Sequence, residues 1–112
     1  MSVPMTAEAL EALKYPVPDD HGSTRDAIAG LVSDAPAFTS PHFPGYTIEI
    51  GYSMALLGLE DLAAKARKPG KRQQHRDNIA LLHASYAAFK RGDDATGMQQ
   101  LQAAYRAMKG GK

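Results

Sequence analysis

The chain has 112 residues, a formal net charge of +1 and no cysteine. This length is typical of one domain with a single core, and the lack of cysteine excludes disulfides, thiolate metal sites and cysteine nucleophiles. No run of about 20 apolar residues is present, so the sequence contains no candidate for a membrane-spanning helix. The first residues lack the basic and apolar regions of a secretion signal, and we therefore expect a cytoplasmic protein.

The small net charge conceals a division between the two parts of the chain. Residues 1–64 hold nine acidic and two basic side chains, whereas residues 65–112 hold three acidic and eleven basic ones. Such asymmetry indicates either an anionic partner for the basic part or pairing of the two parts within the fold. The sequence leaves both interpretations open.

Proline shapes the first part of the chain, because six of the seven prolines precede residue 45. Proline interrupts helices, so we predict two short helices here. The first spans about residues 7–14 with Thr6 as its N-cap. The second spans about residues 24–33 and starts with a capping box formed by Ser23 and Asp26.

Residues 34–45 contain three prolines, which favour extended backbone in the residues that precede them. Phe38 and Phe43 are too apolar for a solvated linker. We therefore predict an extended arm that lies across the helical core and buries both rings. In this interpretation residues 1–112 form one domain, with the proline-rich acidic region 1–45 packed on a core of residues 46–109.

Three long helices are predicted after this arm, so the expected fold class is an all-α bundle. They span about residues 47–67, 71–91 and 94–109, and residues 110–112 are expected to fray. In the first of these helices, apolar residues recur at helical spacing and form one face: Ile48, Tyr52, Ala55, Leu59, Leu62 and Ala66. Residues 46–50 also alternate with a period of two, so a short strand there is the alternative.

The last two helices are joined by a short turn, which predicts an antiparallel hairpin. Gly92 suits the end of one helix and Asp93 the N-cap of the next. Counting outward from the turn, we expect Ala88 to face Gly97 and so allow the two backbones to approach closely. The hairpin resembles one tetratricopeptide unit over about 30 residues in its small and aromatic positions, Ser85, Phe89, Gly92, Gly97 and Ala104. No second copy is visible, and stacked repeats need about three units.

Residues that could carry chemistry are few. The four histidines are His21, His42, His75 and His83; the last two lie about 12 Å apart along a helix, which is too far for one metal ion. No glycine-rich phosphate loop or dinucleotide motif is present. We therefore expect no catalytic residues, no cofactor and no metal, and hence a protein that is not an enzyme.

The most specific signal is a basic elbow, which we define as residues 65–76. Its candidate binding residues are Lys65, Arg67, Lys68, Lys71, Arg72, His75 and Arg76. If a helix starts near Gly70, cations at its positive end are disfavoured by about 0.3–1 kcal/mol each, which favours an external anion. Alternatively the helix starts at Asp77 or Asn78 after a solvated loop, or the acidic part of the chain pairs with these cations.

From this elbow we expect a non-enzymatic accessory or adaptor protein. It would bind another macromolecule, a protein with an acidic surface, through the elbow or a helical surface. The alternative is a sequence-tolerant DNA- or RNA-binding protein that uses the same cations. Gln73, Gln74 and Asn78 could contact base edges, although no aromatic residue lies among the basic ones for stacking. Self-association is also compatible with the sequence, whereas binding to a membrane is not expected.

Overall fold

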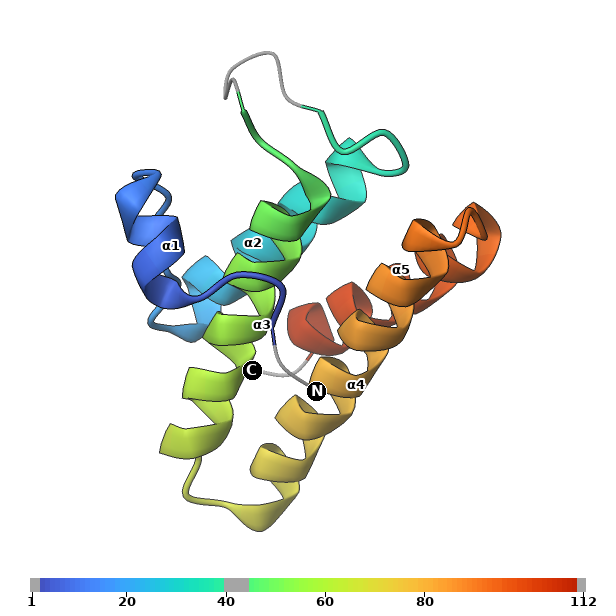
Figure 1. Ribbon diagram of the computed structural model, residues 1–112. Helices are drawn as coiled ribbons and strands as arrows, with labels where there is room; N and C mark the ends of the chain where they lie inside the picture. The colour runs from blue at the N-terminus through green and yellow to red at the C-terminus, as the bar shows by residue number, and fades with distance from the viewer. Residues whose placement is uncertain (1–2, 40–44, 111–112) are drawn as a thin grey trace.

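The computed structural model describes residues 3–39 and 45–110, and all regular structure within these residues is helical (Figure 1). The predicted all-α class is therefore confirmed. The helices are α1 (Ala7–Ala12), α2 (His21–Asp34), α3 (Ile48–Lys65), α4 (Pro69–Lys90) and α5 (Asp94–Gly110). None of these described helices is both long and apolar enough to cross a lipid bilayer.

Side-chain caps start the first helices, and one of them differs from the prediction. Thr6 caps α1 as expected, because its Oγ1 accepts a hydrogen bond from the Ala9 N–H at 3.1 Å. The N-cap of α2 is Asp20 and not Ser23: the Ser23 N–H donates to Asp20 Oδ1 at 2.7 Å, which makes Ser23 the third residue of the capping box. As a result α2 starts three residues early and has 14 residues, more than predicted.

The strand considered for residues 46–50 does not form. Thr47 is extended, and its side chain accepts a hydrogen bond from the Ile50 N–H at 3.3 Å. This bond caps α3, which begins at Ile48. The alternation of polar and apolar residues over 46–50 therefore does not mark a strand: only the N-cap is extended, and the helix begins at the next residue.

The first residues of the proline-rich arm, 35–38, form a turn after α2 instead of running extended. The Phe38 N–H donates to the Asp34 carbonyl at 2.8 Å, which closes a turn at the end of α2. The Phe38 ring is buried as predicted and packs edge-on against Phe89 and Tyr52, with centroid distances of 4.9 and 5.9 Å. Phe43 lies outside the described residues.

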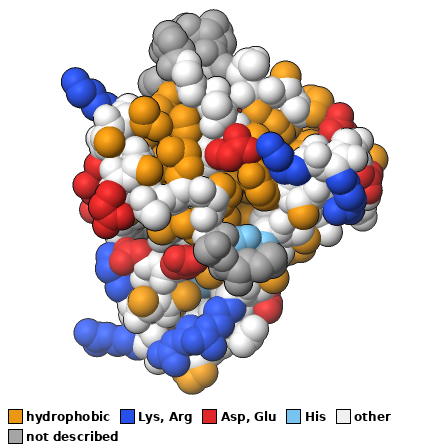
Figure 2. Space-filling view, in the orientation of Figure 1, with side chains coloured by type: hydrophobic (Ala, Val, Ile, Leu, Met, Phe, Trp, Pro, Cys, Tyr) orange, Lys and Arg blue, Asp and Glu red, His pale blue; other side chains and the backbone are white. Residues whose placement is uncertain are grey.

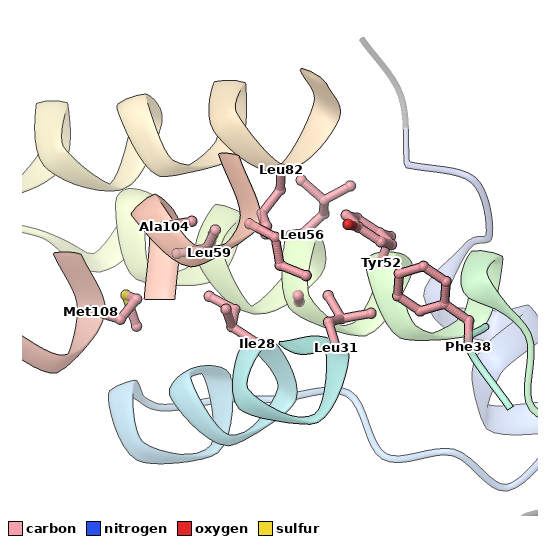
Figure 3. Packing of buried hydrophobic residues seen from close by; sticks show 11 residues of the cluster. Ile28, Leu31, Phe38, Tyr52, Leu56, Leu59, Leu82, Ala104 and Met108 are labelled. Carbon is pink, nitrogen blue, oxygen red and sulfur yellow. The ribbon is translucent and has the colours of Figure 1, made fainter. Parts of the chain in front are cut away.

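Four helices enclose the core. Each contacts the next in the order α2, α3, α4, α5, and α5 returns to contact α2, so the arrangement closes on itself, while α1 packs on α3 (Figure 1). Figure 3 shows side chains from all four converging between them: Ile28, Leu31, Tyr52, Leu56, Leu59, Leu82, Ala104 and Met108. Burial of each large apolar side chain contributes about 1.5–3 kcal/mol.

The α4–α5 hairpin forms at the predicted turn. Gly92 has a φ of 85°, a conformation that glycine adopts without strain, and the Asp93 side chain caps α5 by accepting from the Thr96 N–H at 3.3 Å. The atoms nearest to Gly97 belong to the Phe89 ring and not to Ala88, the expected neighbour: a methyl group at residue 97 would lie 2.8 Å from that ring. Helix α5 continues to Gly110, and residues 111–112 lie outside the described residues.

Candidate functional site

The basic elbow consists of a short connection between two helices and the first turns of the second helix. Helix α3 ends at Lys65, and α4 begins at Pro69. Proline suits the first position of a helix, where the missing N–H would have no partner within the helix. The alternative start at Asp77 or Asn78 is therefore wrong. Figure 2 shows Lys and Arg side chains gathered at this end of the molecule, where α3 meets α4.

The start of α4 lacks the usual compensation for its positive pole. Lys68 occupies the N-cap position without a side-chain hydrogen bond, and the first turn contains no acidic residue. Lys71 and Arg72 lie close behind, as the sequence predicts for a helix that starts near Gly70. These charges are unfavourable for α4, but the Arg72 guanidinium turns back, and its Nη2 donates to the Ala66 carbonyl at 2.9 Å. Arg72 therefore stabilises the end of α3.

Lys65 has a counter-ion within the protein. Its Nζ lies 2.6 Å from Asp61 Oδ2 and also donates to the Asp19 carbonyl at 3.0 Å. The hydrogen bond to Asp61 raises the pKa of Lys65. For this residue the expectation of an elbow without internal counter-ions is wrong, and the pairing of acidic and basic parts is real.

His75 does not belong to the exposed surface of the elbow. Its side chain is 5% exposed, and its Nδ1 has no hydrogen-bond partner within the described part of the chain. Burial lowers its pKa, and the nearby charge of Lys71 lowers it further. A neutral, buried imidazole cannot contact a macromolecule, so His75 is removed from the predicted binding residues.

Three elbow cations face solvent. Arg67, Lys68 and Arg76 are exposed, and none forms an ion pair with another described residue. Arg76 and Arg72 lie one helical turn apart and line a shallow groove of about 460 Å³ between α3 and α4. The groove also contains Glu60 and Ile79. Two guanidinium groups beside an apolar surface can bind carboxylates in a bidentate manner.

The interior carries polar groups with a structural role. Ser85 and His83 are buried, with exposed fractions of 0% and 8%. Ser85 bridges α3 and α5 through its hydroxyl. Within the described residues, no group of three or more His, Asp or Glu side chains could hold a metal ion.

Sequence reasoning missed a second surface feature. The segment 15–18, which lies between the two short helices predicted at 7–14 and 24–33, forms one wall of an apolar groove of about 650 Å³ whose other walls come from α2 and α3. The signal was present in Tyr15 and Val17, which alternate with two prolines. Their grouping with Tyr46 and Met54 around the groove depends on tertiary structure that the sequence does not display.

The chain was also compared with known proteins. No family model matches it, and neither the curated proteins nor the solved structures contain a chain with significant similarity to it.

Proposed function

We propose that this protein is a non-enzymatic accessory or adaptor protein that binds an acidic surface of a partner protein through the basic elbow. The observation that supports this proposal is the exposure of Arg67, Lys68 and Arg76 at one end of the molecule, with no ion pair to any described residue. Lys71 and Arg72 extend the same surface along the first turns of α4.

The shape of the elbow favours a protein as the partner. The groove between α3 and α4 combines Arg72 and Arg76 with the apolar side chain of Ile79, a mixture that suits carboxylates presented beside apolar residues. The elbow also contains no aromatic residue on which a base could stack.

Nucleic acid is the second candidate, because the same exposed cations could neutralise phosphates. The two candidates differ in their response to salt. If about five phosphates were neutralised, the logarithm of the affinity would fall with the logarithm of salt concentration at a slope near −4.5.

The test compares the protein with a charge-matched control. Fluorescence anisotropy at about 50 mM salt, the low end of the range over which such affinities are compared, measures binding to labelled poly-L-glutamate and to single- and double-stranded DNA and RNA. We expect Arg67→Gln/Lys68→Gln to weaken binding to polyglutamate and the control Lys14→Gln/Arg106→Gln, which removes two exposed charges elsewhere, to leave it unchanged. Equal loss in both variants would contradict a role for the elbow.

A capture experiment then addresses the partner itself. Tagged wild-type protein and the Arg67→Gln/Lys68→Gln variant are used to isolate proteins from extracts of the native host. We expect an acidic protein that is retained by the wild type, is released as salt rises and is lost with the variant. Retention of DNA or RNA with the slope given above, without such a protein, would support the second candidate.

A further inference from the structure

The apolar groove formed by the 15–18 segment, α2 and α3 lies outside the elbow. Its volume of about 650 Å³ falls within the range of roughly 300–1,000 Å³ that is typical of ligand pockets. Its apolar surface is supplied mainly by Tyr15, Val17, Tyr46 and Met54. The two tyrosine rings lie 6.2 Å apart with an angle of 56° between their planes, so two aromatic faces border the same opening.

The wall of this groove is fixed in place before any ligand arrives. Pro18 is buried against Gly58, where an added methyl group would lie 2.9 Å from the proline Cβ. On the other side of Pro18, the Asp19 N–H donates to Ser23 Oγ at 3.3 Å, and the Asp19 carbonyl accepts from Lys65. The groove is therefore formed by packing and hydrogen bonds on both sides of its wall.

The same wall limits how a ligand can bind. Pro16 and Pro18 have no backbone N–H, so the segment offers an added strand fewer hydrogen-bond donors than an ordinary strand edge. This favours recognition by side chains that enter the groove. This condition favours an occupant with apolar side chains over one that binds through backbone hydrogen bonds.

The charge of the groove selects the polar part of the occupant. Its charged lining residues are Asp19 and Asp26, both exposed. Arg25 lies 3.9 Å from Asp26 with both side chains well exposed, a contact that solvent screens strongly. An ammonium or guanidinium group beside the two carboxylates would also lie near the tyrosine rings, whose faces attract cations.

We propose that this groove binds a short segment of a partner protein that presents apolar side chains next to a lysine or arginine. The inference rests on the proposed function, because it gives the partner a second contact of opposite charge to the first. The partner would then present an acidic surface to the elbow and a basic apolar segment to the groove.

The test uses a synthetic peptide as the probe, acetyl-Leu-Lys-Val-Pro-Arg-Leu-amide. Two matched peptides carry Glu at both basic positions or Ser in place of Leu and Val. Binding is measured by titration calorimetry and by backbone NMR shifts of the isotope-labelled protein. We expect the basic apolar peptide to bind more tightly than either control and to shift the signals of Val17, Ala27 and Met54.

Variants then test the carboxylates. Exposed ion pairs contribute modestly, so Asp19→Asn/Asp26→Asn is expected to lower the affinity for the basic peptide by about 3- to 10-fold. Asp77→Asn/Asp94→Asn removes two exposed carboxylates outside the groove and is expected to change nothing. Val17→Ser introduces a hydroxyl into the apolar wall and should lower the affinity for the peptide as well. Circular dichroism checks that this variant is folded.

Three results would overturn the inference. The first is equal affinity for the Glu peptide, and the second is a set of NMR shifts that maps away from the groove. The third is concentration-dependent self-association of the protein alone, measured by sedimentation and abolished by Asp19→Asn/Asp26→Asn, since a second copy would then be the occupant.

Failure of this inference can be distinguished from failure of the proposed function. Arg67→Gln/Lys68→Gln is expected to lose binding to polyglutamate and to keep the basic peptide. Asp19→Asn/Asp26→Asn is expected to show the reverse pattern. If the wild-type protein binds the basic peptide but not polyglutamate, the result contradicts the role of the elbow. If it binds polyglutamate but not the basic peptide, the result contradicts the role of the groove.

Discussion

The Tyr52 hydroxyl lies 2.7 Å from Ser85 Oγ, and the direction of this buried hydrogen bond follows from the next one. Ser85 Oγ donates to the Gly97 carbonyl at 2.7 Å. A serine hydroxyl has one proton, so Tyr52 must be the donor to Ser85. Three helices, α3, α4 and α5, are therefore linked by a chain of hydrogen bonds that fixes their positions along one another.

Removing the first hydroxyl of this chain and removing the middle one have different effects. Tyr52→Phe removes one donor and leaves Ser85 bonded to Gly97, so we expect a loss of about 1 kcal/mol in the free energy of unfolding. Ser85→Ala leaves both the Tyr52 hydroxyl and the Gly97 carbonyl without this partner, and we expect a loss of about 2–3 kcal/mol. Urea unfolding of both variants and of the double variant measures these values. Because Ser85→Ala already removes the bond to Tyr52, the double variant should lose less than the sum of the two single losses, and additive losses would show that the Tyr52–Ser85 bond contributes nothing to stability.

A methyl group has opposite effects at two helical glycines. Gly97→Ala would place its Cβ 2.8 Å from the Phe89 ring, and we expect a loss of about 1–3 kcal/mol from overpacking. Gly30 has no atom within 4 Å of the corresponding position. Gly30→Ala should therefore stabilise α2 by about 0.5–1 kcal/mol. Thermal unfolding of both variants tests this contrast, which would be contradicted if both shifted the midpoint in the same direction.

Two buried histidines make the fold sensitive to mild acid. Burial lowers the pKa of His75 and of His83 below the ordinary value of 6.5, so the unfolded chain binds protons more readily than the folded one. Stability should then fall as pH drops below about 6.5, by at most about 1.4 kcal/mol per pH unit for each histidine. The measurement is urea unfolding at pH 7.5, 6.0 and 5.0.

The matched variants for this pH dependence are His75→Gln and His83→Gln. Each removes one titrating group while keeping a polar side chain, so each should flatten the decline in stability between pH 7.5 and 5.0. An unchanged decline in both variants would assign the acid sensitivity to other groups.

We expect a further loss of stability at a lower pH, caused by protonation of Glu49 and separate from the effect of the histidines. Burial alone would raise its pKa, but hydrogen bonds from Lys90 at 2.9 Å and Tyr86 at 3.0 Å outweigh this effect and lower it below 4.5. A carboxylate with a depressed pKa stabilises the fold above its unfolded pKa, and this contribution is lost as pH falls through the folded pKa. Glu49→Gln should remove that part of the acid transition. NMR titration of the Glu49 carboxyl carbon gives the pKa directly, and a value above 4.5 would contradict the prediction.

Local patterns predicted most of the helices. The spacing of apolar residues from Ile48 onward, the cap at Thr6 and the turn at Gly92 are signals carried by neighbouring residues, and each produced the expected element. The predicted start of α2 was wrong because two capping boxes overlap in the sequence, one from Ser23 to Asp26 and one from Asp20 to Ser23. The sequence does not show that the Ser23 N–H donates to Asp20.

The candidate site was predictable only in part. The basic residues of the elbow follow one another in sequence, so their grouping was visible. The burial of His75 and the pairing of Lys65 with Asp61 and with the Asp19 carbonyl depend on how the helices pack. The apolar groove joins residues from three separate segments, and periodicity within any one of them does not reveal it.

The tight turn between α4 and α5 has a consequence for how the molecule assembles. Closing so short a loop costs little chain entropy, whereas the contacts of α5 with α2 join residues far apart in the sequence and require a much larger loop to close. We therefore expect the α4–α5 pair to form early and to offer its apolar side to α3. The return of α5 to α2 would then be the slow step that completes the native structure.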